Sequence, residues 1–421
     1  MTMTVSTISI DSAFFRQAFS ELAQIGRDPS GRGYQRLAWS EAEREAHRWF
    51  RDRAGQLGLE VFTDAAGNSF AELASPESGP ALAIGSHLDT VPFGGAYDGG
   101  YGVVGALAAA EAIQRSGLKL SRPLRVCAFT DEEGPRFGTG LLGSKALAGA
   151  LDMDLVRRAQ DREGTPLKDA MARFGLDLED LPSAARVRPT FLGYLELHIE
   201  QGPRLEQSHI RTAAVTAITG IRQVSLHFVG KTNHAGTTPK PDRRNALRAA
   251  AETIARFSPW VDAQEELVAN PGQITVHPNA ANVVPGEVRL DWDVRSPDPN
   301  RLQAAVEYLI TVAEDVSRPF HISVDSQIFH DVPPCPMHPD WIELVASAAE
   351  RLNLSCDRLV SWAGHDAGVL GRVMPAAMIF IPSRAGVSHA PEEYSTDEAM
   401  LDGVRLLAQT AADLLTREAE S

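Results

Sequence analysis

The stretch ALAIGSHLDTVPFGGAYDGGYGVVGALAAAEAI, residues 81–113, joins three features that decide the fold. Residues 81–87 form a nearly continuous apolar run that ends in a histidine, which predicts a buried strand. A glycine-rich turn follows at residues 94–100, and the small residues of 102–117 predict a closely packed helix. A buried strand that leads through a turn into a helix is typical of an α/β sheet with helices on its faces.

Other segments repeat this alternation of apolar runs and helical patterns. Further buried strands are predicted within PLRVCAFTDEEG (123–134), LELHIEQG (195–202) and AAMIFIPS (376–383). Residues 37–58 have helical spacing, with Ser40 as the expected N-cap. The sequence therefore predicts an α/β fold with a mostly parallel sheet covered by helices.

A second pattern begins near residue 212 and predicts an inserted domain. Its expected elements, in the order βαββαβ, cover residues 223–231, 245–257, 272–278, 286–296, 300–316 and 321–329. That order suits a small split-βαβ sheet. We therefore expect a first part of the main domain at 1–211, an inserted domain at 212–329 and a second part of the main domain at 330–421.

Composition excludes several classes of protein. A net charge of −15 spread along the sequence argues against a nucleic-acid partner, because that affinity depends on clusters of Lys and Arg. No apolar run reaches the ~18 residues of a membrane span, and the N-terminus lacks a secretory signal, so a cytoplasmic protein is expected. Three widely spaced cysteines predict neither a disulfide framework nor a thiolate zinc site.

Four predicted strand ends carry side chains that bind metal ions. These residues are His87, Asp98, Glu133, His198 and His389. Each has a structural explanation when taken alone: a capping pair, a charged surface turn or a core histidine. Ligands bind at the carboxyl ends of strands in open α/β sheets, so their recurrence at one edge favours a shared function. Three imidazoles and two carboxylates suit two divalent ions bridged by a carboxylate better than one tetrahedral ion.

Two more acidic residues accompany the predicted ligands. Glu132 precedes Glu133, and adjacent carboxylates at a buried strand end repel each other unless a cation or protons offset them. Two ions ~3.5 to 4 Å apart can lower the pKa of a shared water toward ~7, and Glu132 is the expected general base for that water. Asp89 is expected to accept the second N–H of His87 and so to fix its tautomer.

Seven motifs stand out along the chain: GSHLDTVPFGGAYDGGYGV (85–103), TDEEGPRFGTGLLGS (130–144), LELHIEQGP (195–203), GKTNHAGTTP (230–239), ANVVPGEVRLDWDVRSPD (281–298), AGHDA (363–367) and PSRAGVSHAPEE (382–393). Together they resemble the hydantoinase/carbamoylase family of metal-dependent amidases, within the dinuclear metallopeptidase superfamily. The resemblance runs in order from about residue 20 to 415. It implies a catalytic domain interrupted by a lid domain that also forms a homodimer interface.

The resemblance also implies how the predicted ligands are shared. Asp98 corresponds to the bridging ligand, His87 and His198 to one metal site, and Glu133 and His389 to the other. The histidine at position 198 favours the amidases, because the peptidase branches usually have a carboxylate there. Two divalent ions per subunit are implied, Zn²⁺ or else Mn²⁺, Co²⁺ or Ni²⁺, and mixed His and carboxylate ligands leave that choice open.

Further positions resemble the family's substrate contacts. His234 corresponds to a residue that reaches the partner subunit's active site and stabilises an oxyanion, and Asn282 and Arg295 to residues that hold a substrate carboxylate. The remaining substrate-binding positions are Gln201, Arg222 and Gly364. One departure is Trp362, which stands before AGHDA where the family usually has glycine and which is expected to reshape the pocket.

The expected function is hydrolysis of the amide C–N bond of a linear N-carbamoyl amino acid with a free carboxylate. Allantoate, β-ureidopropionate, N-acyl amino acids and dipeptides remain alternative substrates for the same metal centre. The chain could instead be a catalytically silent binding protein that retains the fold, although the complete ligand set with Glu132 argues against this. Neither nucleic acid nor a membrane is expected as a partner.

Overall fold

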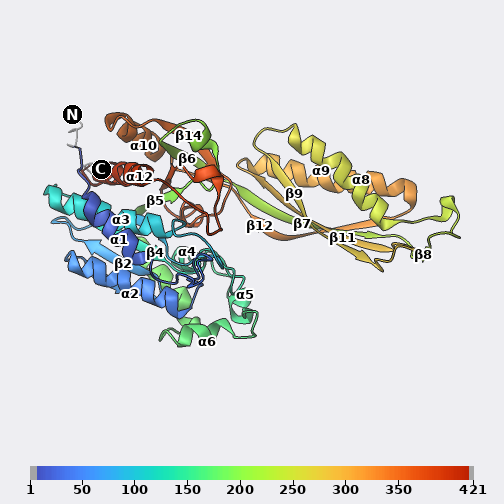
Figure 1. Ribbon diagram of the computed structural model, residues 1–421, viewed down its shortest axis with the longest axis horizontal. Helices are drawn as coiled ribbons and strands as arrows, with labels where there is room; N and C mark the ends of the chain where they lie inside the picture. The colour runs from blue at the N-terminus through green and yellow to red at the C-terminus, as the bar shows by residue number, and fades with distance from the viewer. Residues whose placement is uncertain (1–6, 417–421) are drawn as a thin grey trace. The chain divides into compact units, whose positions relative to one another are not determined.

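The computed structural model describes residues 7–416 and divides the chain into two compact units (Figure 1). The large unit comprises the chain up to Thr216 and from Met337 onward, and the inserted unit comprises Ala217–Pro336. We expected the insertion to begin at residue 212, but residues Ala213 and Ala214 still pair with the strand Ala376–Ile381 of the large unit. At its other end the insertion continues past residue 329, because its last long strand runs to Val332.

The large unit contains one sheet and helices on both of its faces. Its strands are β1 (Glu60–Thr63), β2 (Ser69–Leu73), β3 (Ala81–His87), β4 (Leu124–Phe129), β5 (Phe191–Ile199), β6 (Thr212–Ile218), β14 (Cys356–Ser361) and β15 (Ala376–Ile381). Its helices are α1 (Ser12–Leu22), α2 (Glu41–Gln56), α3 (Gly100–Ser116), α4 (Leu142–Ala148), α5 (Met153–Arg158), α6 (Leu167–Ala172), α7 (Arg204–Gln207), α10 (Pro339–Arg351), α11 (Asp366–Leu370) and α12 (Asp397–Thr416). Two 3₁₀ segments lie at Leu178–Thr190 and Arg384–Gly386.

The strands of this sheet lie in the order β1-β2-β4-β3-β5-β15-β6, where β6 also pairs with β14 and with the short β13 (Cys335–Pro336). The four central strands β4, β3, β5 and β15 are parallel, whereas β1, β2 and β6 pair antiparallel with their neighbours. Every residue of β3 is buried, as the apolar run predicted. The predicted α/β class with a mostly parallel central sheet is thus confirmed, and the antiparallel strands are confined to its flanks.

Consecutive residues of β5 show how the helices form two layers. Leu197 lies against Gly102 and Gly105 of α3, and it also contacts Gly403 of α12. Glu196 points to the opposite face, because successive strand residues alternate. There its carboxylate accepts the backbone N–H of Ala367 in α11 at 2.8 Å. The parallel strands are therefore covered on both faces, and their carboxyl ends remain for side chains that carry chemistry.

The inserted unit is an antiparallel sheet covered by two helices on one face (Figure 1). Its elements are β7 (Gly220–Val229), β8 (Asn233–His234), α8 (Ala246–Asp262), β9 (Val268–His277), β10 (Val283–Val284), β11 (Glu287–Ser296), α9 (Pro299–Ser317), β12 (Ser323–Val332) and β13 (Cys335–Pro336), with 3₁₀ turns at Lys240–Asp242 and Arg318–Phe320. The main strands lie in the order β12-β7-β11-β9. Figure 1 shows α8 and α9 side by side, and Phe257, Trp292 and Leu309 belong to the core that they share with the sheet.

Within residues 7–416, no helix is both long enough and apolar enough to cross a membrane.

Candidate metal centre

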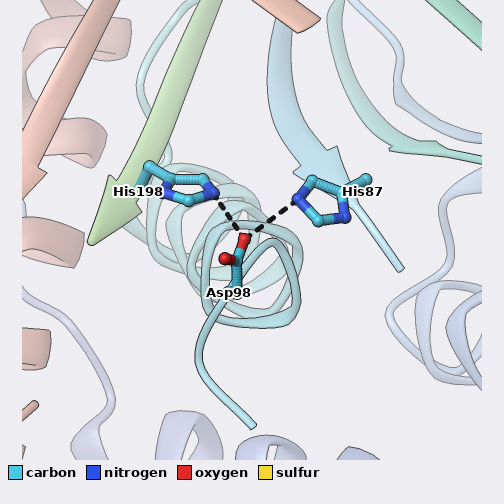
Figure 2. A group of neighbouring side chains, drawn as sticks. All are labelled: His87, Asp98 and His198. Atoms are coloured by element: carbon cyan, nitrogen blue, oxygen red, sulfur yellow. Dashed lines mark ion pairs between the residues drawn. The ribbon is translucent and has the colours of Figure 1, made fainter. Parts of the chain in front are cut away.

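His87, Asp98 and His198 converge at the carboxyl ends of two parallel strands (Figure 2). His87 is the last residue of β3, His198 lies near the end of β5, and Asp98 precedes helix α3. The Oδ1 atom of Asp98 lies 3.2 Å from Nε2 of His87 and 3.1 Å from Nε2 of His198. Both rings are only 1% exposed, so this group lies inside the protein.

Backbone carbonyls fix the tautomers of these two histidines. The Nδ1 atom of His87 lies 3.1 Å from the carbonyl oxygen of Asp89, and Nδ1 of His198 lies 2.9 Å from that of Ile199. A carbonyl oxygen can only accept a hydrogen bond, so each Nδ1 must carry the proton. In a neutral ring each Nε2 then presents a lone pair toward the Asp98 side of the site, as a metal-ligating histidine requires.

Asp98 can approach His87 only because a glycine follows it. Gly99 adopts φ +59°, and a Cβ atom at this position would lie 2.4 Å from the imidazole ring of His87. Any other residue would both strain the backbone and collide with the ring. Gly99, one of the glycines of the turn, therefore serves this close approach.

Asp98, Glu133 and His389 form a second group that shares the aspartate. Nε2 of His389 lies 3.3 Å from Oδ2 of Asp98 and 3.3 Å from Oε2 of Glu133. Asp98 therefore directs Oδ1 to the first group and Oδ2 to the second. The five predicted ligands lie together, and the aspartate has the arrangement of a bridging carboxylate.

The chemistry of these donors fits divalent cations. Burial and the neighbouring Asp98 carboxylate raise the pKa of Glu133 to about 8, while the hydrogen bond with Asp98 raises the pKa of His389 to about 9. The Oε1 atom of Glu133 is buried without a hydrogen-bond partner among the described residues. A buried carboxylate oxygen of this kind is costly unless a cation accompanies it. Imidazole nitrogens with carboxylates suit Zn²⁺, Mn²⁺, Co²⁺ or Ni²⁺.

Glu132 lies at the edge of the cluster. Its Oε2 atom is 3.9 Å from Nε2 of His87, and its side chain is 10% exposed. Burial raises its pKa well above the usual range, and the nearby carboxylates of Glu133 and Asp366 act in the same direction. Glu132 is thus separate from both ligand groups but close to them, as a general base for a water at the site would be.

Asp89 makes a different main contact from the one expected. Its carboxylate is 3.5 Å from Nδ1 of His87, farther than its own backbone carbonyl. Instead, Oδ1 accepts the backbone N–H of Glu132 at 3.0 Å, and Oδ2 accepts that of Glu133 at 3.1 Å. Strand β3 ends at His87, so the chain can turn at Asp89 and direct this carboxylate toward the loop after β4.

Two buried residues beside the proposed ligands were not predicted from the sequence. The ring of His365 packs against that of His198, with centroids 4.5 Å apart, and its Nε2 lies 2.9 Å from the Ser361 hydroxyl oxygen. Glu393 is 4% exposed, and its carboxylate contacts the loops that carry Asp98 and His389. Both residues belong to quoted motifs, and the adjacent glutamates of SHAPEE were the available signal for Glu393.

Two predicted substrate residues lie in the large unit. The Nε2 amide of Gln201 donates to Oδ2 of Asp98 at 2.7 Å, which joins Gln201 to the cluster. Gly364 lies between β14 and α11, and a Cβ atom there would have no atom within 4 Å. Nearby Trp362 is 37% exposed at the end of β14.

The other predicted substrate residues lie in the inserted unit. His234 and Asn282 are neighbours, since Ala235 donates its N–H to the Asn282 carbonyl at 2.9 Å and β8 pairs with β10. Arg222 contacts Asp331 and Gln303 of α9 on the helix-covered face of the sheet. Arg295 pairs with Asp293 and lies on the opposite face. The structure thus brings together His234 and Asn282 but separates the two arginines.

Comparison with known proteins identifies the family of the chain. The model of peptidase family M20/M25/M40 matches residues 83–413. The chain is 35% identical to an N-carbamoyl-L-amino acid amidohydrolase of Geobacillus stearothermophilus, covering 96% of this chain and 98% of that protein. It is 34% identical to an allantoate amidohydrolase of Escherichia coli (94% and 97% covered) and to a ureidoglycolate hydrolase of Oryza sativa (97% and 86% covered).

A solved structure gives the same result for the fold. An amidase of the hydantoinase/carbamoylase family from Burkholderia phymatum superposes with a TM-score of 0.86 at 32% identity, covering 98% of this chain and 99% of that one. Family, relatives and fold agree with the resemblance inferred from the seven motifs. The chain therefore belongs to peptidase family M20/M25/M40, as a metal-dependent hydrolase related to the hydantoinase/carbamoylase amidases.

Proposed function

We propose that this protein hydrolyses the amide C–N bond of a linear N-carbamoyl amino acid at a centre of two divalent ions. The observation that carries the proposal is the sharing of Asp98, whose two oxygens face two separate groups of potential ligands. In this assignment His87 and His198 hold one ion, and Glu133 and His389 hold the other. The relatives named for ureido substrates support the substrate class.

The side chains then divide the chemistry among them. When bound, the ions supply a Lewis acid that polarises the substrate carbonyl and lowers the pKa of water. Glu132 takes a proton from the attacking water and returns it to the leaving amine. Asp89 holds the backbone of Glu132 and Glu133 through its two oxygens. For a carbamoyl substrate the products are the amino acid, carbon dioxide and ammonia.

Recognition of the substrate carboxylate is assigned to Arg295 with Asn282, and stabilisation of the oxyanion to His234. Gln201, Arg222 and Gly364 are further substrate contacts in this proposal. Because Arg222 and Arg295 lie on opposite faces of one sheet, Arg295→Lys and Arg222→Lys test these two assigned contacts separately. We expect Arg295→Lys to raise KM about tenfold or more, since a charge-assisted hydrogen bond contributes roughly 1.5 to 3 kcal/mol. The homodimer through the inserted unit can be checked by light scattering.

A substrate panel tests the proposed function. Metal-free protein is reconstituted separately with Zn²⁺, Mn²⁺, Co²⁺ or Ni²⁺ and assayed on N-carbamoyl-L-amino acids, allantoate, β-ureidopropionate, ureidoglycolate, N-acetyl amino acids and dipeptides. Ammonia release from N-carbamoyl amino acids is expected to give the highest kcat/KM. Amine release from acetyl amino acids or dipeptides alone would contradict the proposal, and inactivity with every metal would favour a binding protein.

Allantoate is the second candidate substrate. The Escherichia coli relative named for allantoate matches nearly as well as the relative named for N-carbamoyl-L-amino acids. The carbamoyl group and the carboxylate occur in both compounds, so the same assigned residues suit either. A higher kcat/KM for allantoate in the panel would select this alternative while leaving the assigned metal centre and Glu132 in place.

A further inference from the structure

Glu393 lies buried between two loops that carry proposed metal ligands. It follows β15 and the loop of His389, and it is 4% exposed. Its Oε1 atom accepts two backbone hydrogen bonds, from the N–H of Tyr97 at 2.9 Å and from that of Asp98 at 3.0 Å. One oxygen therefore holds the peptide groups that fix the position of the bridging aspartate.

The other oxygen of Glu393 holds the second loop. Oε2 accepts the Ser388 hydroxyl at 2.8 Å and the backbone N–H of His389 at 3.3 Å. The Ser388 oxygen also lies 3.1 Å from Oδ2 of Asp98. A single carboxylate thus connects two loops that are almost three hundred positions apart in the sequence. One loop carries Asp98 and the other carries His389, which are proposed ligands of the same ion.

Two further observations indicate that the surrounding structure allows only one placement of the Glu393 carboxylate between these loops. His389 adopts φ +57°, a left-handed conformation that a non-glycine residue keeps only where its surroundings impose it. Gly95 lies against the Glu393 side chain so closely that a Cβ atom there would be 2.1 Å from Oε1 and 2.5 Å from Cβ of Glu393. The Asp98 loop therefore has no space for a different placement of this carboxylate.

We propose that Glu393 is a positioning residue that holds Asp98 and His389 in register and thereby sets the affinity for the ion bound by Asp98, Glu133 and His389. Glu393 reaches neither group of ligand atoms itself and acts through the two loops. Partners that orient metal ligands commonly affect metal affinity by about 10-fold to 100-fold. The inference rests on the proposed function, because it requires both ions to bind.

The test is a titration of the metal-free protein with Co²⁺. Binding is monitored by calorimetry and by the visible absorption of the bound ion. Wild type is expected to bind two ions. Glu393→Gln keeps the size of the side chain but replaces one acceptor oxygen with an NH₂ group, which would face backbone N–H groups or a hydroxyl. We expect it to bind the ion held by Asp98, Glu133 and His389 about 10-fold to 100-fold more weakly, with a smaller loss for the other ion, whose group shares only Asp98 with these loops.

Asp64→Asn is the matched control. Asp64 is 8% exposed, and its Oδ1 accepts the backbone N–H groups of Ala66 and Asn68 at 2.9 and 3.0 Å, but it lies outside the ligand loops. This variant should lower the thermal unfolding temperature and leave both Co²⁺ affinities unchanged. If both variants lost Co²⁺ affinity, the effect of Glu393→Gln would be due to general destabilisation, and the inference would be overturned.

Gly95→Ala disturbs the same contact without changing Glu393, which keeps the test decisive if Glu393→Gln does not fold. Gly95→Ala should lower the Co²⁺ affinity of the same site, the one formed by Asp98, Glu133 and His389. Two-ion binding with wild-type affinity in a folded Glu393→Gln or Gly95→Ala protein would overturn the positioning role and leave the proposed metal centre intact. A wild-type protein that bound no Co²⁺ would instead overturn the proposed function, and this inference with it.

Discussion

The carboxylate of Asp89 accepts the backbone N–H of Glu132 at 3.0 Å, and this bond ties the end of β3 to the loop after β4. The second oxygen does the same for Glu133 at 3.1 Å. The proposed general base and an adjacent proposed ligand are thus positioned through their backbone by one buried side chain. The contact is between peptide groups and a carboxylate, so side-chain types in the motif give little indication of it.

Asp89→Asn should therefore impair positioning more than substrate binding. An asparagine amide presents an NH₂ group to one of the two N–H donors, and an unmet buried donor costs about 1 to 3 kcal/mol. We expect kcat to fall on the order of 10-fold to 100-fold with little change in KM. Faster hydrogen exchange at the amides of Glu132 and Glu133 would accompany this. Unchanged exchange at both amides would show that Asp89 does not hold this loop.

Glu132→Gln tests the general base directly. Glutamine has the same size but cannot accept the proton of the attacking water, so kcat should fall on the order of 10²-fold or more. Because Glu132 is not among the proposed ligands, the variant should retain its metal, as measured by elemental analysis of the dialysed protein. Turnover near that of wild type in a fully metallated Glu132→Gln protein would remove Glu132 from the mechanism.

The central sheet could be predicted because its strands are almost entirely apolar. Residues 81–87 are buried along their whole length and were recognised from the sequence alone. The flanking strands β1 and β2 were not recognised, because neither Glu60–Thr63 nor Ser69–Leu73 contains a continuous apolar run. The insertion was expected from residue 212, whereas β6 still pairs with β15, a strand that is distant in sequence.

The clustering of the proposed ligands could also be predicted, because these imidazoles and carboxylates follow strands whose carboxyl ends meet at one edge of the sheet. The geometry placed His87, Asp98 and His198 together as expected. The contacts that hold these ligands were not predictable in the same way. Glu393 acts on backbone N–H groups of loops far away in sequence, and no local pattern records such a contact.

His47 should make stability depend on pH below neutrality. Burial lowers its pKa to about 3, with Arg51 acting in the same direction and Asp89 opposing it. In the unfolded chain the His47 ring, with an ordinary pKa near 6.5, is protonated below that pH. In the folded protein the ring stays neutral down to pH ~3. The stabilising contribution of neutral His47 is thus complete above pH ~6.5 and is lost as the pH falls.

The measurement compares wild type with His47→Gln by urea unfolding of metal-free protein at pH 7 and pH 5. The free energy of unfolding of wild type, relative to the variant, should fall by about 2 kcal/mol between these pH values. Glu43 lies 3.9 Å from the His47 ring, and burial raises its pKa to about 8, but it is present in both proteins. An equal pH dependence in the two proteins would mean that His47 protonates normally when folded.

Gly99→Ala tests the close approach between residue 99 and the proposed metal ligand His87, and Gly117→Ala is its comparison variant. Both glycines have a positive φ, +59° at Gly99 and +68° at Gly117, but only Gly117 has the left-handed α conformation, where alanine costs roughly 1 to 2 kcal/mol. At Gly99, with ψ −54°, the backbone cost of alanine is greater. At Gly117 the added Cβ would have no atom within 4 Å, whereas at Gly99 it would lie 2.4 Å from the His87 ring. Only Gly99→Ala should therefore displace His87 from Asp98, and we expect it to lose at least tenfold in Co²⁺ affinity beyond any loss in Gly117→Ala. Equal Co²⁺ affinities in the two variants would show that this close approach does not matter for the proposed centre.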